Sequence, residues 1–167
     1  SIIFFTFALV LKKYLAILAL VAISITACNE NVLVDTFHEL PADGWGYEFA
    51  VTDSFTIDKP NHYHAVSANL RASADYPYAN IHLLLTITAP DGDTTQIKVP
   101  VELAEKSGKW LGSGLRDVFT FQRPILHRKY FNQKGTYTVT IAQDMRLENL
   151  PSVSAAGIRV EEQEEIF

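Results

Sequence analysis

Residues 79–103 read ANIHLLLTITAPDGDTTQIKVPVEL, two alternating segments joined by a turn. In residues 79–89 every second side chain is a large aliphatic one, and in residues 95–103 a similar two-residue period resumes. A period of two is typical of a strand with one buried face. Pro90-Asp91-Gly92 supplies the turn, because proline fixes φ and glycine accepts positive φ. The stretch therefore predicts an antiparallel hairpin.

The same alternation recurs on both sides of this hairpin. Residues 125–131 also permit a short helix ended by Gly135, but their alternation favours a strand. Asp53 interrupts one apolar face and predicts a bulge. About eight short strands separated by turns predict an all-β fold, an antiparallel β-sandwich or jelly roll. The predicted strands cover residues 47–57, 62–72, 79–89, 95–103, 118–123, 125–131, 136–141 and 156–161.

The beginning of the chain has the pattern of a bacterial lipoprotein signal. Lys12-Lys13 precedes an apolar run over residues 14–24, which is followed by Ile25-Thr26-Ala27-Cys28. A basic segment, an apolar segment and small residues before a cut are typical of a secretory signal peptide. A membrane-spanning helix needs about 20 apolar residues, and residues 14–27 are too few. The ending resembles a lipobox, which predicts that residues 1–27 are removed and that Cys28 carries fatty acyl chains such as palmitate.

The rest of the chain divides into three parts. Residues 28–44 show no sustained periodicity and contain turn residues, which predicts a tether. Residues 45–162 hold the alternating segments and predict one β-sandwich domain, a length that is sufficient for a hydrophobic core. Residues 163–167 predict a solvated acidic tail.

Charge and cysteine content exclude several classes of function. The formal net charge is −5, and removal of residues 1–27 takes away two lysines and no acid, which leaves −7. Nucleic-acid binding is disfavoured, because affinity for phosphate comes from clustered Lys and Arg. Cys28 is the single cysteine, so no intramolecular disulfide can form. The size of the domain indicates that it folds with no metal or other cofactor.

Several short motifs follow one another over nearly all of residues 28–162. The motifs are Cys28, Arg71 followed by Tyr76-Pro77-Tyr78-Ala79-Asn80, Gly108-Lys109-Trp110-Leu111-Gly112-Ser113-Gly114, Gly135-Thr136-Tyr137, Met145-Arg146, Leu150-Pro151 and Gly157-Ile158-Arg159-Val160-Glu161. Taken together, with their order and spacing, they resemble the gliding-motility lipoproteins of the GldH family.

The resemblance implies an envelope lipoprotein at the outer membrane that is required for surface gliding. It also implies association with the proteins that export surface adhesins. Members of that family are not known as enzymes, so the expected role is a structural or interaction role without catalysis. The partners expected are the membrane, through lipidated Cys28, and other envelope proteins of gliding and secretion.

Other residues raise weaker hypotheses of chemistry. His62 and His64 would project from one face of a strand, a spacing that suits zinc, but no third ligand is evident. Ser113 lies between two glycines, but a nucleophile elbow needs a strand-to-helix turn. Those glycines also lack the Lys and Ser or Thr of a phosphate loop. We therefore predict no catalytic or metal site.

Aromatic residues suggest where partners bind. Tyr76, Tyr78, Trp45 and Trp110 would stack on sugar rings if they were coplanar and exposed, which makes a lipid-anchored glycan-binding module the alternative function. If they are buried, a scaffold is favoured. The predicted partner-binding residues are Arg71, Tyr76, Tyr78, Asn80 and Trp110.

Overall fold

The computed structural model describes residues 31–60 and 62–163. The predicted signal peptide, Cys28 and most of the acidic tail lie outside the described residues. Within these ranges the chain is all-β, which confirms the predicted fold class, and no helix is long and apolar enough to cross a membrane. The strands are β1 (Val32–Asp35), β2 (His38–Glu39), β3 (Trp45–Gly46), β4 (Ala50–Ile57), β5 (Tyr63–Ser73), β6 (Asn80–Thr88), β7 (Thr94–Glu102), β8 (Ser113–Leu115), β9 (Val118–Tyr130), β10 (Gly135–Gln143), β11 (Asn149–Leu150) and β12 (Val153–Glu162).

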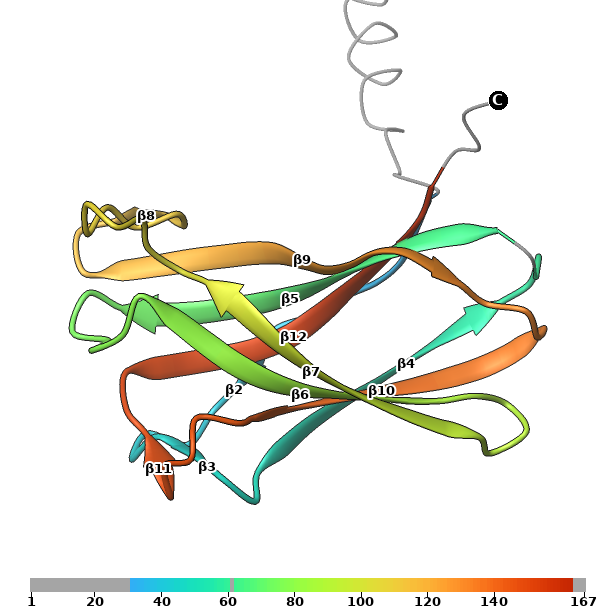
Figure 1. Cartoon of the computed structure of the whole chain (residues 1–167), viewed down its shortest axis with the longest axis horizontal. Helices are drawn as coiled ribbons and strands as arrows, with labels where there is room; N and C mark the ends of the chain where they lie inside the picture. The colour runs from blue at the N-terminus through green and yellow to red at the C-terminus, as the bar shows by residue number, and fades with distance from the viewer. Residues whose placement is uncertain (1–30, 61, 164–167) are drawn as a thin grey trace, which may run out of the picture. The chain divides into compact units, whose positions relative to one another are not determined.

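The strands form two facing antiparallel sheets and a small ribbon (Figure 1). A six-stranded sheet has the order β1-β12-β5-β9-β8, with β2 also paired to β12. A four-stranded sheet has the order β4-β10-β6-β7, and β3 pairs with β11. The ribbon and β8 lie at the same end of the sandwich, on the left in Figure 1. This end is where the candidate functional residues gather.

The hydrophobic core lies between the two sheets. Every second residue of β6 is buried, from Ile81 to Ile87, and the facing residues of β5 and β10 are buried as well. A cluster of aromatic rings closes one end of this core, with Phe131 stacked edge-on against Tyr137 at 4.7 Å between ring centroids. The alternation in the sequence therefore corresponds to burial against the opposite sheet.

The structure confirms most of the predicted strands and joins two of them. β6 and β7 form the predicted hairpin, in which Leu85 pairs with Ile97. β9 runs without interruption through the ambiguous residues 125–131, up to Tyr130, so a strand is the correct assignment there. The strands that alternation did not predict are β1, β2, β3, β8 and β11, each four residues or shorter. Segments this short carry too little periodic pattern to be recognised.

Two expectations about the first half of the chain were wrong. The domain begins at Asn31 and not at Trp45, because β1 and β2 pair with β12 and extend the sheet. Asp53 forms no bulge and pairs in register with Val139. Its carboxylate instead accepts a hydrogen bond from the Thr36 hydroxyl at 2.7 Å and lies 2.8 Å from the His38 ring. The Asp53 carboxylate can face inward because Thr36 and His38, from the segment expected to be a tether, are its partners.

Candidate functional site

Tyr76 and Tyr78 form a fixed pair in the connection between β5 and β6. Tyr76 is 3% exposed, and its hydroxyl donates a hydrogen bond to the carbonyl oxygen of Asn80 at 3.0 Å. Burial, with Tyr78 beside it, raises the pKa of the Tyr76 phenol. The Tyr78 ring is 39% exposed and meets Tyr76 edge-on, with centroids 5.7 Å apart. Buried Tyr76 therefore supports the ring of Tyr78, which is exposed to solvent.

Trp110 lies in the Gly-rich connection between β7 and β8. Its indole is partly buried and packs against Phe119 and Phe121, at 5.6 and 6.2 Å between centroids. Gly112 makes this packing possible, since a Cβ there would stand 2.7 Å from the Phe121 ring. Trp110 therefore holds this irregular loop against β9.

Backbone hydrogen bonds bring these two loops together. The amides of Leu103 and Ala104 both donate to the carbonyl oxygen of Ala79, at 2.8 and 2.9 Å. The amide of Ala74 donates to the carbonyl oxygen of Asp117 at 2.7 Å. Four of the five predicted residues, Tyr76, Tyr78, Asn80 and Trp110, thus belong to one connected group of loops.

Arg71 belongs to a neighbouring contact on the outer face of the six-stranded sheet. Its guanidinium donates to the Glu39 carboxylate at 3.1 Å and lies 5.5 Å from the centroid of the Phe37 ring. Both partners come from the N-terminal segment that had been expected to be a tether. The structure therefore assigns Arg71 a structural contact that its position in the sequence did not indicate.

The four aromatic residues do not form a flat exposed platform. Trp45 is fully buried and Tyr76 nearly so. Tyr76 and Tyr78 lie at 74° to each other, whereas rings that share one sugar-binding surface would be coplanar. Coplanar and exposed rings would have favoured glycan binding. The burial and the angle seen here favour a scaffold over a sugar-stacking surface at these residues.

The two histidines that suggested a metal site have other contacts. The His62 ring lies 2.6 Å from the Glu162 carboxylate. His64 is buried, its Nδ1 lies 3.1 Å from the His62 carbonyl oxygen, and its ring meets Phe131 edge-on. Burial lowers the pKa of His64. In the part of the chain that the structure describes, no three His, Cys, Asp or Glu residues are grouped to hold a metal ion.

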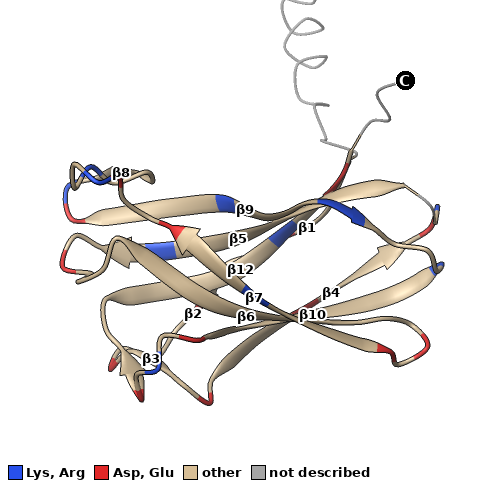
Figure 2. Cartoon of the chain, in the orientation of Figure 1, with Lys and Arg blue, Asp and Glu red and all other residues tan. Residues whose placement is uncertain are grey.

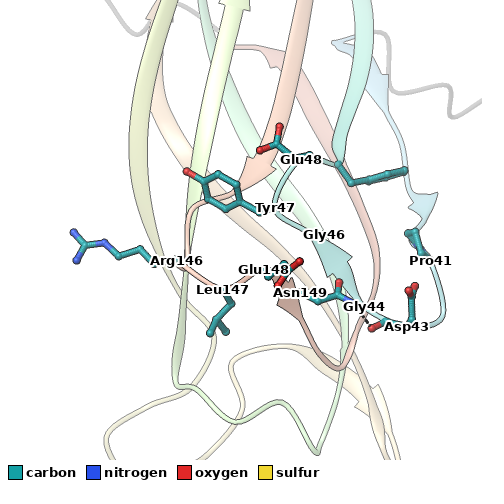
Figure 3. Close-up of a pocket in the computed structure, with 11 residues that line it drawn as sticks. Pro41, Asp43, Gly44, Gly46, Tyr47, Glu48, Arg146, Leu147, Glu148 and Asn149 are labelled. Atoms are coloured by element: carbon teal, nitrogen blue, oxygen red, sulfur yellow. Dashed lines mark hydrogen bonds between the residues drawn. The ribbon is translucent and has the colours of Figure 1, made fainter.

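Sequence reasoning missed a cavity at the same end of the sandwich as these loops. It has a volume of about 1070 Å³ and lies between the β3–β4 and β10–β11 connections (Figure 3). Tyr47 and Phe49 alternate with polar residues at the start of the predicted strand 47–57, which predicts that they are buried. They are instead 48% and 41% exposed, at the cavity. The lining residues are Pro41, Asp43, Gly44, Gly46, Tyr47, Glu48, Phe49, Arg146, Leu147, Glu148 and Asn149.

Buried polar groups hold the walls of this cavity in place. The side chain of Gln143 is buried, donates to the Leu147 carbonyl oxygen at 2.7 Å, and accepts from the Met145 amide at 2.8 Å. The Trp45 indole donates to the Phe49 carbonyl oxygen at 2.8 Å. These bonds fix both loops against the core. One signal was present in the sequence, since the cavity contains Arg146 of the Met-Arg motif.

The cavity is acidic with aromatic walls. The lining residues include three acids, Asp43, Glu48 and Glu148, and a single cation, Arg146. Arg146 has a φ of 58°, which is uncommon for a residue other than glycine and sets the sharp turn of its loop. Such a surface offers hydrogen-bond acceptors beside apolar rings. Nothing in it resembles a nucleophile paired with a base.

Comparisons with known proteins agree with the motifs found in the sequence. The family model described as GldH lipoprotein matches residues 32–160, which is nearly the whole of the described sandwich. The gliding motility lipoprotein GldH of Flavobacterium johnsoniae is 26% identical over 160 residues, covering 91% of this chain and 98% of that protein. A GldH homolog of Christiangramia forsetii is 29% identical over 100 residues, covering 56% of this chain and 62% of that protein.

One solved structure, that of the Gx strain of infectious bursal disease virus, aligns with 79% of this chain and 31% of its own. Its TM-score of 0.34 and identity of 16% are too low to bear on fold or function. The family assignment rests on the model match and on the two relatives. This chain belongs to the GldH lipoprotein family.

Proposed function

We propose that this protein is a non-catalytic component of the cell envelope, held at the outer membrane by acyl chains on Cys28. It acts in gliding motility by binding other proteins of the gliding and adhesin-export machinery. Membership of the GldH family supports the general role. The arrangement of loops at one end of the sandwich supports an interaction surface.

The interaction surface is centred on Tyr78. Exposed tyrosines held in a fixed orientation contribute strongly to protein interfaces, because little side-chain entropy is lost on binding. Tyr78 meets this description, since it leans on buried Tyr76, whose hydroxyl is bonded to Asn80. The single observation that carries the proposal is that the exposed Tyr78 ring packs against the buried Tyr76 ring. Rigid strands with functional loops at one end are a common arrangement in β proteins.

Replacement of Tyr78 in the gliding bacterium tests the proposal. Tyr78→Ala should abolish gliding and remove envelope proteins from the material that cross-links to this chain, while the protein stays folded and abundant. Gln96→Ala, an exposed change on β7, is the control and should leave both unchanged. Normal gliding with unchanged cross-links in a folded Tyr78→Ala protein would contradict the proposal. Loss of the folded protein would mean that Tyr78 is a structural residue.

Glycan binding is the second candidate, and the cavity is the observation that favours it. Tyr47 and Phe49 offer apolar rings, while Glu48 and Glu148 offer acceptors for sugar hydroxyls. If a glycan binds there, the purified protein should show saturable binding to an envelope polysaccharide, and Tyr47→Ala should remove that binding. Tyr78→Ala should not affect it. This pair of variants separates the two candidate functions.

A further inference from the structure

The second half of β9 and the turn after it carry a concentrated positive charge. Residues 118–143 contain Arg123, Arg128, Lys129 and Lys134 and no acidic residue, although the whole chain has a net charge of −5. Figure 2 shows these cations along β9, while acids mark many of the other loops. This segment is therefore locally basic in a protein whose net charge is negative.

This basic segment lies at the end of the sandwich where the domain is joined to Cys28. The amide of Glu162 donates to the carbonyl oxygen of Asn31 at 2.7 Å. In the same sheet, Glu162 pairs with His64 and His64 pairs with Lys129. Adjacent strands are about 4.8 Å apart, so Lys129 lies about 14 Å across the sheet from the first described residue.

The chain between Cys28 and the domain is short. Cys28 stands three residues before Asn31. Three residues of fully extended chain span at most about 11 Å. Acyl chains on Cys28 would therefore hold this end of the sandwich close to the lipid headgroups. The loops around Tyr78 lie at the opposite end of β5, an 11-residue strand.

Two tyrosines beside the basic segment complete a surface of interfacial type. Tyr63 pairs with Tyr130, and their ring centroids are 5.5 Å apart. Tyr130 is 47% exposed, and the Arg128 guanidinium lies 4.2 Å from the centroid of the Tyr63 ring. Tyrosine together with Arg or Lys is typical of the boundary between lipid and water, because the rings are amphipathic and the cations attract anionic headgroups.

The open edge of β9 raises the alternative that a peptide strand binds there. β8 pairs with β9 only at residues 118–120, so among the described residues the rest of this edge has no neighbouring strand. However, Pro124 and two register shifts interrupt the ladder between β5 and β9. Proline, bulges and basic side chains are features by which edge strands resist the addition of another strand. The chemistry of the edge therefore favours headgroups over a peptide.

We propose that the end of the sandwich formed by Tyr63, Arg128, Lys129 and Tyr130 lies against the anionic membrane surface. The Tyr78 end then points away from the membrane, toward protein partners. The proposal rests on the acylation of Cys28 that is part of the proposed function. It adds the orientation of the domain and the identity of the lipid-facing residues.

The test uses the acylated mature protein in vesicles of phosphatidylcholine and phosphatidylglycerol. Two separate variants, Asn132→Cys and Asn80→Cys, each replace an exposed asparagine at one end of the sandwich. Because Cys28 is acylated, the new cysteine is the only free thiol in each variant. A fluorophore on residue 132 should be quenched strongly by headgroup spin-labelled lipid, and one on residue 80 should be quenched weakly. The double variant Arg128→Gln, Lys129→Gln should weaken the headgroup contact of residue 132, by about fivefold for each charge removed. The matched control removes two charges elsewhere, with Lys106→Gln and Lys109→Gln, and should leave the quenching at residue 132 unchanged.

Mass spectrometry of the same samples reports acylation, so failure of the lipid anchor is distinguished from failure of the orientation. Equal quenching at residues 80 and 132 in acylated protein would overturn the orientation. Quenching at residue 132 that is insensitive to phosphatidylglycerol and to the β9 substitutions would overturn the assignment of the lipid-facing residues. The comparison of residues 80 and 132 needs no charge variant, so it holds even if the double variant does not fold.

Discussion

Asn69 on β5 donates a hydrogen bond to the Asp35 carboxylate on β1 at 2.7 Å, across the intervening strand β12. The amide also donates to the Thr36 carbonyl oxygen at 3.0 Å, and its oxygen accepts from Gln122 at 3.0 Å. Asn69 is completely buried. It can reach across β12 because the residue paired with it there is Gly157, which has no side chain. This contact fastens the first described strand of the domain to the centre of the sheet.

Replacement of Asn69 should destabilise the domain. Asn69→Ala removes three hydrogen bonds made by a fully buried side chain, so we expect a loss of about 1–3 kcal/mol in the free energy of unfolding. Urea denaturation of the mature protein measures it. Asn132→Ala, at an exposed position, is the control and should change little. Equal stability of the two variants would show that water replaces the Asn69 contacts.

Substitution at Gly157 should be destabilising for a steric reason. A Cβ at this position would overlap the carbonyl group of Thr36 and stand 2.6 Å from its carbon. Because the obstacle is backbone, we expect Gly157→Ala to cost about 1–3 kcal/mol of stability. Gly46→Ala is a matched control, since its new Cβ would be 3.9 Å from the Phe49 Cβ. Comparable melting temperatures for the two variants would be inconsistent with the packing described here.

Leu83 tests the core that the alternation predicted. Its side chain is fully buried between the sheets. Leu83→Ala removes buried methyl groups and leaves a cavity, so a loss of about 2–5 kcal/mol is expected. Leu115→Ala makes the same change at a side chain that is 89% exposed, and thermal unfolding should hardly differ from that of the native chain. A small effect at Leu83 would mean that the core relaxes around the deletion.

Stability should fall as the solution becomes more acidic, in part through His64. Burial lowers the pKa of His64 below its ordinary value of 6.5, and this outweighs the hydrogen bond to the His62 carbonyl and the charge of Glu162. Between 6.5 and the folded-state pKa, the unfolded chain binds a proton that the folded chain does not. Stability therefore rises with pH in this window and decreases as the pH falls through it.

Denaturation in urea from about pH 7.5 to about pH 5 measures this dependence. His64→Gln should flatten the curve below 6.5, whereas His127→Gln, at an exposed position, should keep its slope. An unchanged slope in His64→Gln would assign the pH dependence to other groups.

Replacement of Cys28 should prevent lipidation and cleavage of the chain. Each buried CH₂ of an acyl chain contributes about 0.8 kcal/mol, and two chains hold a protein stably where one does not. Cys28→Ala should give an unprocessed precursor that takes up no labelled fatty acid during growth. A native chain that itself remains unlabelled would contradict lipidation at Cys28.

The alternation along the chain was sufficient to predict the long strands and the β6–β7 hairpin. It worked because each of these strands buries one face against the opposite sheet, so burial is recorded as a period of two. It was also enough to place Leu83 in the core. The assignment of Tyr76, Tyr78 and Trp110 to partner binding came from the motifs and the aromatic residues, and it stays a prediction. The motifs of the family were sufficient to indicate the family to which the chain belongs.

Other features depend on contacts between residues distant in the sequence. The segment before Trp45 became part of the sheet because β12 supplies its hydrogen bonds, and no local pattern in four residues encodes that partner. Tyr47 and Phe49 follow the period of a buried face, yet they line a cavity because the four-stranded sheet begins only at Ala50. The basic residues of β9 and the first described residue, Asn31, are about a hundred residues apart in sequence. Only the pairing of β1, β12, β5 and β9 places them at one end, since sheet order is set by tertiary packing and not by local sequence.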